Sequence, residues 1–240
     1  MREMVWVTGS GSKNGIGYAI CKALSNREFE YVALDVKFDE DVIGDYLNIA
    51  DELDIRNYFD EHSLPSHIVN CAGVNITDEF VNYDMGNFDK VYDVNVRGTF
   101  MFTREFIKRA MKFSGPKFII NIGSESGSTP RTNSVVYCSS KAAISMFTKS
   151  WAREFAKNGF RVIELAPSLV LDTNMDIYIN NAAARLQGKT SEEIKRYRIS
   201  KAPIGRFAIP GEIAAWVPFL LENGEYANGS CIHIAGGISG

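Results

Sequence analysis

The feature that most constrains the fold is a glycine-rich turn between a short apolar strand and a helix. Residues 4–8 are apolar and predict a strand, and residues 16–25 predict a helix. Gly9, Gly15 and Gly17 lie at the turn, where glycines permit a sharp reversal and let the backbone approach a diphosphate at the helix N-terminus. The pattern predicts the first unit of a dinucleotide-binding fold. The alternative is a flexible surface loop.

The alternation of strand and helix continues along the chain. Further strands are expected at 31–34, 67–70, 117–122, 161–165 and 230–234, and further helices at 50–62, 88–111, 135–158 and 213–221. Strands that alternate with helices predict an α/β fold with a doubly wound parallel sheet of the Rossmann type and helices on both faces. Because the chain contains no repeat or linker, we expect residues 1–240 to form a single domain.

Composition and charge exclude several other classes of protein. The chain is 45% hydrophobic with a net charge of −3, so the basic footprint of a nucleic-acid-binding protein is absent. No apolar run approaches the ~18 residues that a membrane span needs, and residues 1–7 are too short and too soon interrupted for a signal peptide. The cysteines form no Cys-x-x-Cys pair, and the histidines have no metal-ligand spacing. We therefore expect a cytoplasmic protein with reduced thiols, no bound metal, and no nucleic-acid or membrane partner.

Asp35 ends the second expected strand and bears on the choice of cofactor. An acid at this place typically accepts hydrogen bonds from the adenosine ribose hydroxyls and repels a 2′-phosphate. Lys13, in the turn, has the opposite effect because its ammonium could meet such a phosphate. We weigh the acid more heavily, so NAD is the expected cofactor and NADP is the alternative.

Tyr137 and Lys141 form a candidate acid–base pair. They stand at i and i+4, so a helix over 135–158 places both side chains on one face. A fixed ammonium beside a phenol favours phenolate and lowers the phenol pKa, and a phenol tuned in this way can exchange a proton with a carbonyl or alcohol oxygen. Ser124 follows the strand at 117–122, where its hydroxyl could hydrogen-bond the same oxygen.

The spacing of this pair is not specific by itself. The Tyr-x-x-x-Lys pattern also begins at Tyr18 and at Tyr197, but neither has a hydroxyl residue at the position that corresponds to Ser124. For an isolated match, the alternative is a core tyrosine, a solvated lysine and a loop serine. The choice between a catalytic and a structural role for these residues therefore depends on other motifs in the chain.

Other motifs follow in a fixed order. They are Thr8-Gly9 with Gly15-Ile16-Gly17, Asn70-x-Ala72-Gly73, Asn95, Ser124, Tyr137-x-x-x-Lys141, Pro167, and late in the chain Pro203–Phe207 and Asn228–Gly237. Together they make the chain resemble the short-chain dehydrogenases/reductases in their compact single-domain form, over essentially its whole length. Within that family it is similar to the 3-oxoacyl-acyl-carrier-protein reductases.

The resemblance implies an NAD(P)-dependent oxidoreductase that transfers a hydride between nicotinamide and a ketone or secondary alcohol. Tyr137 would be the general acid/base, and Ser124 would hold the reacting oxygen. Lys141 would bind the nicotinamide ribose and lower the pKa of Tyr137, and Asn95 would bind a water that links Lys141 to solvent. The implied cofactor contacts are Gly9, Ser12, Asn14, Gly15, Ile16, Gly17, Asp35, Asn48, Ile49, Asn70, Ala72, Gly73, Tyr137, Lys141, Pro167, Val170 and Thr173.

The chain departs from the family pattern in three places. Residues 10–14 make the glycine-rich turn longer than usual, which leaves open whether Ser10, Ser12 or Asn14 contacts phosphate. Ser168 stands where the family usually has glycine, so this turn cannot rely on glycine's freedom at positive φ. Beyond it, Thr173 is one residue later than the family's usual threonine.

The substrate is less closely defined than the cofactor. A 3-oxoacyl thioester and a sugar or polyol are the two classes that the resemblance implies, and a catalytically silent nucleotide-binding scaffold is the alternative from another class. Residues 174–206 are expected to form a substrate lid, in which basic residues outnumber acidic ones by seven to three. A basic lid could attract an anionic substrate, but a solvated helix face is the favoured interpretation.

A homo-oligomer, and specifically a tetramer, is implied by the resemblance. The helices expected from residues 88 and 135 add a modest hint, because they carry a heavy apolar load for helices with one face on a sheet. The residues concerned are Phe100, Phe102, Phe106, Met146, Phe147 and Trp151. The alternative is that these side chains all pack inward.

Overall fold

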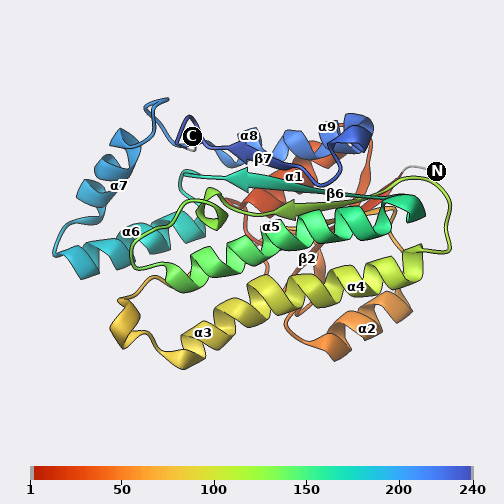
Figure 1. Ribbon diagram of the computed structural model, residues 1–240, viewed down its shortest axis with the longest axis horizontal. Helices are drawn as coiled ribbons and strands as arrows, with labels where there is room; N and C mark the ends of the chain where they lie inside the picture. The colour runs from red at the N-terminus through yellow and green to blue at the C-terminus, as the bar shows by residue number, and fades with distance from the viewer. Residues whose placement is uncertain (1–2, 239–240) are drawn as a thin grey trace.

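A parallel β-sheet forms the centre of the molecule, and helices cover both of its faces (Figure 1). A computed structural model describes residues 3–238. Within these residues the sheet has seven strands in the order β3-β2-β1-β4-β5-β6-β7. They are β1 (Met4–Thr8), β2 (Glu30–Asp35), β3 (Asp45–Tyr46), β4 (His67–Asn70), β5 (Lys117–Ile122), β6 (Phe160–Pro167) and β7 (Cys231–Ile234). The strand order reverses between β1 and β4, and in open parallel sheets ligands bind at the carboxyl ends of the strands beside such a reversal. The predicted Rossmann-type fold is therefore confirmed.

The helices form a layer on each side of the sheet, and two helices lie beyond the strand ends. One face is covered by α1 (Ile16–Ser25), α8 (Pro210–Ala214) and α9 (Trp216–Asn223). The other is covered by α2 (Glu52–Glu61), α4 (Thr99–Ala110) and α5 (Val135–Phe155), with α3 (Met85–Tyr92) leading into α4. The helices α6 (Asn174–Gln187) and α7 (Ser191–Ser200) project past the carboxyl ends of the strands (Figure 1). No helix within residues 3–238 is both long enough and apolar enough to cross a membrane.

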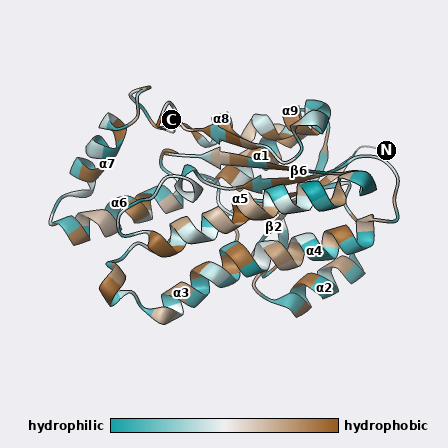
Figure 2. Ribbon diagram, viewed as in Figure 1, coloured by the Kyte–Doolittle hydropathy of each residue, from teal (hydrophilic) through white to brown (hydrophobic). Residues whose placement is uncertain are grey.

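Successive residues of β1 enter the two different cores of the molecule, as the alternation of side chains along a strand requires. Trp6 packs between the sheet and α2, with its ring centroid 4.9 Å from those of Tyr58 and Phe59. Its neighbours Val5 and Val7 pack on the side of α1 and α9. Strands that are buried on both faces consist of continuous apolar residues, and Figure 2 shows the helices that cover them with mixed hydrophobic and hydrophilic colouring.

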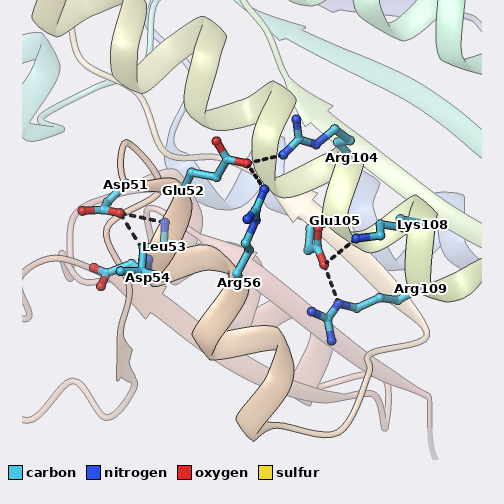
Figure 3. Close-up of polar contacts among 9 residues, drawn as sticks. All are labelled: Asp51, Glu52, Leu53, Asp54, Arg56, Arg104, Glu105, Lys108 and Arg109. Atoms are coloured by element: carbon cyan, nitrogen blue, oxygen red, sulfur yellow. Dashed lines mark hydrogen bonds and ion pairs between the residues drawn. The ribbon is translucent and has the colours of Figure 1, made fainter.

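Charged side chains join α2 to α4 on the surface (Figure 3). Asp51 caps α2 by accepting hydrogen bonds from the backbone of its first turn. Glu52 of α2 lies 2.6 Å from Arg104 of α4, and Glu105 and Arg109 pair at 2.7 Å within α4. Exposed pairs such as Glu52–Arg104 add little stability, so the apolar contacts beneath them hold these helices together.

Several boundaries differ from the sequence predictions. The single helix predicted over 88–111 consists of α3, a π-helical turn at Asp93–Gly98 and α4. The helix predicted over 213–221 is divided into α8 and α9, and the short strand β3 lies at residues 45–46, where no strand is predicted. In the lid region, Gly188 ends α6 with a φ of +63° and Thr190 begins α7 with a capping box.

Candidate active site

A cavity of about 230 Å³ opens at the carboxyl ends of the strands and joins residues that are far apart in the sequence. The glycine-rich turn, the end of β5, the start of α5, the end of β6 and the two lid helices all contribute to its lining. Its predicted members are Gly9, Ser12, Asn14, Gly15, Ile16, Gly17, Gly73, Ser124, Tyr137, Lys141, Pro167, Val170 and Thr173. The fold thus brings most of the predicted site residues together.

The glycine-rich turn fits a pyrophosphate. Gly9 has a φ of +70°, and a Cβ on it would lie 2.5 Å from the Cα of Ala72, so a larger residue would collide with backbone. Gly15 precedes the first turn of α1 and offers no side-chain cap, and that turn contains no acidic residue. The first N–H groups of α1 therefore have no side-chain acceptor and can bind an anion.

The longer turn is tied to the beginning of the lid. Asn14 donates hydrogen bonds to the Asp172 carbonyl at 2.9 Å and to the Asn174 side chain at 3.2 Å. Asn174 in turn donates to Ser12 Oγ at 3.0 Å. Ser10 is buried, and its hydroxyl donates to the Val7 carbonyl at 2.9 Å. The structure therefore favours Ser12 and Asn14 over Ser10 as the polar side chains that face the cavity.

Acidic groups surround the place expected for the adenosine ribose. The Asp35 carboxylate accepts a hydrogen bond from the Gly11 amide at 2.8 Å. Asp39 accepts from the Lys13 amide at 2.8 Å, and this hydrogen bond is the main cause that lowers the pKa of Asp39. The Lys13 ammonium lies 3.5 Å from the Asp41 carboxylate. Lys13, the base that could have met a 2′-phosphate, is thus already beside an acid.

Some predicted cofactor residues are not part of the cavity lining. The buried Asn70 amide donates to Thr103 at 2.9 Å and to Asn121 at 2.8 Å, so its side chain belongs to an internal network. The other predicted residues outside the lining are Asp35, Asn48, Ile49 and Ala72. Their contact with a cofactor stays a prediction.

Three side chains of the candidate catalytic centre share the cavity. Tyr137 and Lys141 come from consecutive turns of α5, and Ser124 follows β5. All three are buried. The Lys141 ammonium donates to the Ile122 carbonyl at 2.9 Å and lies 5.8 Å from the centroid of the Tyr137 ring. The predicted grouping of these three residues agrees with the geometry.

The net shift of the Tyr137 pKa is opposite in direction to the one expected from Lys141. Burial raises the pKa of Tyr137 to about 12, and this outweighs the lowering by the Ser124 hydroxyl and by the charge of Arg131. Burial also lowers the pKa of Lys141. A low-dielectric site disfavours both the phenolate of Tyr137 and the ammonium of Lys141. The phenol therefore stays protonated, whereas the sequence predicted a lowered Tyr137 pKa.

Met175 covers the tyrosine hydroxyl. The Tyr137 hydroxyl donates to the Met175 sulfur at 3.8 Å, and Met175 belongs to the first turn of α6. Thr173, the N-cap of α6, accepts from the Asp176 amide at 3.0 Å and lines the cavity, whereas the side chain of Asp172 pairs with Lys195. Thr173, although one residue later in the sequence than the family's usual threonine, therefore still lines the cavity.

Asn95 uses its side chain within the protein. Its Oδ1 accepts from the Val74 amide at 2.8 Å, and its Nδ2 donates to the Val74 carbonyl at 2.9 Å and to Ser140 Oγ at 3.0 Å. It lies in the π-helical turn between α3 and α4, and such turns are frequent at functional sites. The side-chain amide is thus engaged by Val74 and Ser140.

The lid contributes residues that the sequence did not single out. Three of its seven basic side chains pair with acids outside the lid: Arg185 lies 3.5 Å from Asp78, Lys195 lies 2.9 Å from Asp172, and Arg206 lies 2.6 Å from Glu212. Arg198 differs, because it lines the cavity. The lining residues that were not predicted from the sequence as site residues are Cys71, Ile122, Gly123, Ser168, Asn174, Met175, Asp176, Ile179 and Arg198. Within a polar helix such as α7, the sequence has no signal that separates Arg198 from its solvated neighbours.

Known proteins share both the sequence and the fold. A family model described as short chain dehydrogenase matches residues 62–184. A 3-oxoacyl-[acyl-carrier-protein] reductase of Aquifex aeolicus (strain VF5) is 31% identical over 95% of this chain and 95% of its own length. A sorbitol-6-phosphate 2-dehydrogenase of Klebsiella pneumoniae is 29% identical over 98% of this chain and 95% of its own length. The crystal structure of a 3-oxoacyl-[acyl-carrier protein] reductase from Brucella melitensis in complex with NAD is 27% identical, covers 100% of this chain and 98% of its own, and has a TM-score of 0.83.

The sequence similarity and the shared fold extend over nearly the whole chain, and the resemblance inferred from the motifs is confirmed. The chain therefore belongs to the short-chain dehydrogenase/reductase family and is an NAD(P)-dependent oxidoreductase that acts between ketones and secondary alcohols.

Proposed function

We propose that Ser124, Tyr137 and Lys141 are the catalytic residues and that NAD is the preferred cofactor. The observation that carries this proposal is the convergence of the three side chains in one cavity with the glycine-rich turn. A bound nicotinamide dinucleotide supplies or accepts the hydride. The chain then has to bind the cofactor, orient the substrate and move one proton.

Tyr137 is the proton donor in the direction of ketone reduction. Burial keeps its phenol protonated, which suits the donation of a proton to an oxygen that gains negative charge. Ser124 hydrogen-bonds the same oxygen and holds it against the phenol. The substrate oxygen has to displace the Met175 sulfur, which is the present partner of the hydroxyl. The Met175 side chain therefore has to move when substrate binds.

Lys141 and Asn95 support the proton donor. Lys141 binds the nicotinamide ribose, with its ammonium oriented by the Ile122 carbonyl. Asn95 holds the segment at Val74 beside the cavity through its side chain. Its contact with a water that links Lys141 to solvent stays a prediction.

The acids around the turn support NAD over NADP. Asp35 and Asp39 are held by backbone amides, and Asp41 lies beside Lys13. A 2′-phosphate would meet negative charge from several sides.

The substrate is a 3-oxoacyl thioester or, alternatively, a sugar or polyol. The similarity to the Aquifex aeolicus reductase supports the first class, and the similarity to the Klebsiella pneumoniae dehydrogenase supports the second. Asp176 and Arg198 make the lid side of the cavity polar, which favours a compact polar substrate over a long acyl chain.

The working protein is a homo-oligomer in the cytoplasm, with a tetramer as the proposed assembly. Phe102 and Phe106 are buried in the protein's own core, but Phe100 and Met146 stay 40% and 59% exposed on α4 and α5. Closed symmetric association is the usual way to bury such a face. The four cysteines are free thiols, in keeping with a reducing compartment.

Substitution of Tyr137 by Phe tests the catalytic assignment. The variant keeps the ring and should bind NADH normally, as followed by nicotinamide fluorescence. Turnover should fall by about 10²–10⁴-fold, the usual contribution of general acid–base catalysis. Near-normal turnover with any ketone that the wild type reduces would refute the assignment of Tyr137.

A further inference from the structure

Arg198 is a cationic side chain of the lid that reaches the cavity of Ser124 and Tyr137. It lies on α7, and its side chain is 14% exposed. Its guanidinium stands over the Phe207 ring, 5.0 Å from the centroid. A guanidinium that is largely covered, stacks on a ring and pairs with a carboxylate is oriented before any ligand binds.

The hydrogen bonds of Arg198 use one edge of the guanidinium. Nη1 donates to Asp176 Oδ1 at 2.6 Å and also to Asn180 Oδ1. Among residues 3–238, Nε and Nη2 have no hydrogen-bond partner, and neither is a fully buried unpaired atom. Nε and Nη2 form the parallel pair of donors that matches a carboxylate in a bidentate contact.

Asp176 and Ser168, which line the same cavity, already accept hydrogen bonds within the protein. Asp176 Oδ1 accepts from Arg198, and Oδ2 accepts from the Asp172 amide at 3.3 Å. Ser168, which lines the same cavity, accepts from Arg131 at 3.1 Å and keeps its own proton to donate. The polar groups that remain for a ligand are therefore mainly donors, and donors suit an anion better than a neutral hydroxyl.

The charged side chains near the cavity favour a ligand group with one negative charge over a group with two. Arg198 is paired with Asp176, and Arg131 is paired with the fully buried Glu125. A dianion such as a phosphate would face these carboxylates with little excess positive charge, while a carboxylate matches the one free guanidinium edge.

From this arrangement we propose that the substrate is a small oxo acid, or the corresponding hydroxy acid, whose carboxylate binds the free edge of Arg198 while its carbonyl lies between Ser124 and Tyr137. This inference rests on the proposed function, because it needs Ser124 and Tyr137 as catalytic residues, but it replaces the thioester, sugar or polyol with a small oxo acid. Arg198 sets specificity and touches the substrate away from the reacting carbon.

The test compares each oxo acid with its own methyl ester. Acetoacetate and levulinate, and their methyl esters, are reduced with NADH and NADPH, with dihydroxyacetone phosphate as the phosphate-bearing ketone. We expect kcat/KM for an oxo acid to exceed that for its ester by about 10–100-fold in the wild type. In Arg198→Gln the ratio should collapse toward one. Because the ratio is an internal comparison, partial loss of folded protein does not change it.

Three further variants sharpen the test. Arg198→Gln combined with Asp176→Asn removes the pair together and avoids an unpaired buried carboxylate, and it should lose the ratio as well. Arg198→Lys keeps the charge without the planar fork and should recover only part of the ratio. Arg196→Gln is the matched control, since Arg196 is exposed on the same helix and outside the cavity lining, and it should keep the wild-type ratio.

The outcomes separate this inference from the proposed function. A wild-type ratio near one, or a ratio that survives in Arg198→Gln, would overturn carboxylate recognition alone. An Arg198-dependent preference for dihydroxyacetone phosphate over both oxo acids would replace the carboxylate with a phosphate. A 3-oxoacyl thioester and a sugar are assayed beside these ketones. Turnover of the thioester or the sugar alone would overturn this inference only, and failure of all the substrates with both nicotinamides would overturn the proposed function and this inference with it.

Discussion

Gly123 packs against the side chain of Glu164 beside the candidate catalytic centre, so a methyl group added at Gly123 should lower the stability of the protein. Gly123 lines the cavity immediately before Ser124. A Cβ built on Gly123 would lie 1.8 Å from Oε1 of Glu164 and 2.6 Å from its Cδ. Glu164 is fully buried, and its Oε1 accepts from Ser145 at 2.9 Å. The carboxylate therefore has no open space into which it could swing.

The expected cost follows from these contacts. Forcing an extra methyl group into packed surroundings costs about 1–3 kcal/mol, and the loss of the Ser145 hydrogen bond adds about 1 kcal/mol. Gly123→Ala should thus destabilise the protein by about 2–4 kcal/mol. For a chain of this size, that corresponds to a fall in Tm of roughly 5–15 °C.

A double-mutant cycle followed by thermal unfolding measures this contact. Gly123→Ala, Glu164→Ala and the double variant are compared with the wild type, and the double variant should be more stable than Gly123→Ala, with a coupling energy of about 1–3 kcal/mol. Gly211→Ala is the control, because a Cβ there meets nothing within 4 Å. Strictly additive effects, or a Gly123→Ala protein that unfolds at the wild-type temperature, would refute the reasoning.

Three other predictions concern the cofactor, the tyrosine and the assembly. Asp35→Ser should shift the preference from NAD toward NADP, as measured by the two KM values, because a 2′-phosphate no longer meets that carboxylate; a wild type that already prefers NADP would contradict this. The pKa of Tyr137 is about 12 in the folded protein against 10.0 for an ordinary tyrosine, so between these values the folded state holds a proton that the unfolded chain releases. The contribution of this group to the free energy of unfolding is complete below pH 10 and is lost as the pH rises toward 12. Tyr137→Phe should therefore lose less stability between pH 10 and pH 12 than the wild type does. An equal loss in the two proteins would show that the phenol ionises normally. Light scattering across a dilution series should find an oligomer, and a monomer with full activity at micromolar concentration would exclude a functional role for assembly.

Local patterns were enough to predict the elements that carry the fold. The helix α1 begins and ends where its apolar period and its glycines indicate, and β1, β4 and β5 coincide with their apolar runs. The boundaries that failed depend on partners from elsewhere in the chain. The break between α3 and α4 falls at Asn95, whose side chain bonds the backbone of Val74, and no local propensity encodes that contact.

Features that depend on neighbouring residues can be predicted without the fold: the alternating strands and helices, the glycine-rich turn, and Tyr137 and Lys141 on one face of α5. Helical spacing is a property of the local chain, so a motif read from the sequence keeps its geometry in the fold. Only the tertiary structure decided which cation of the lid reaches the cavity and how the tyrosine titrates. Arg196 and Arg198 are two arginines of the same polar helix, but packing leaves the Arg198 side chain only 14% exposed and leaves Arg196 in solvent. Burial likewise reversed the expected shift at Tyr137, because desolvation is produced by segments that meet only when the chain has folded.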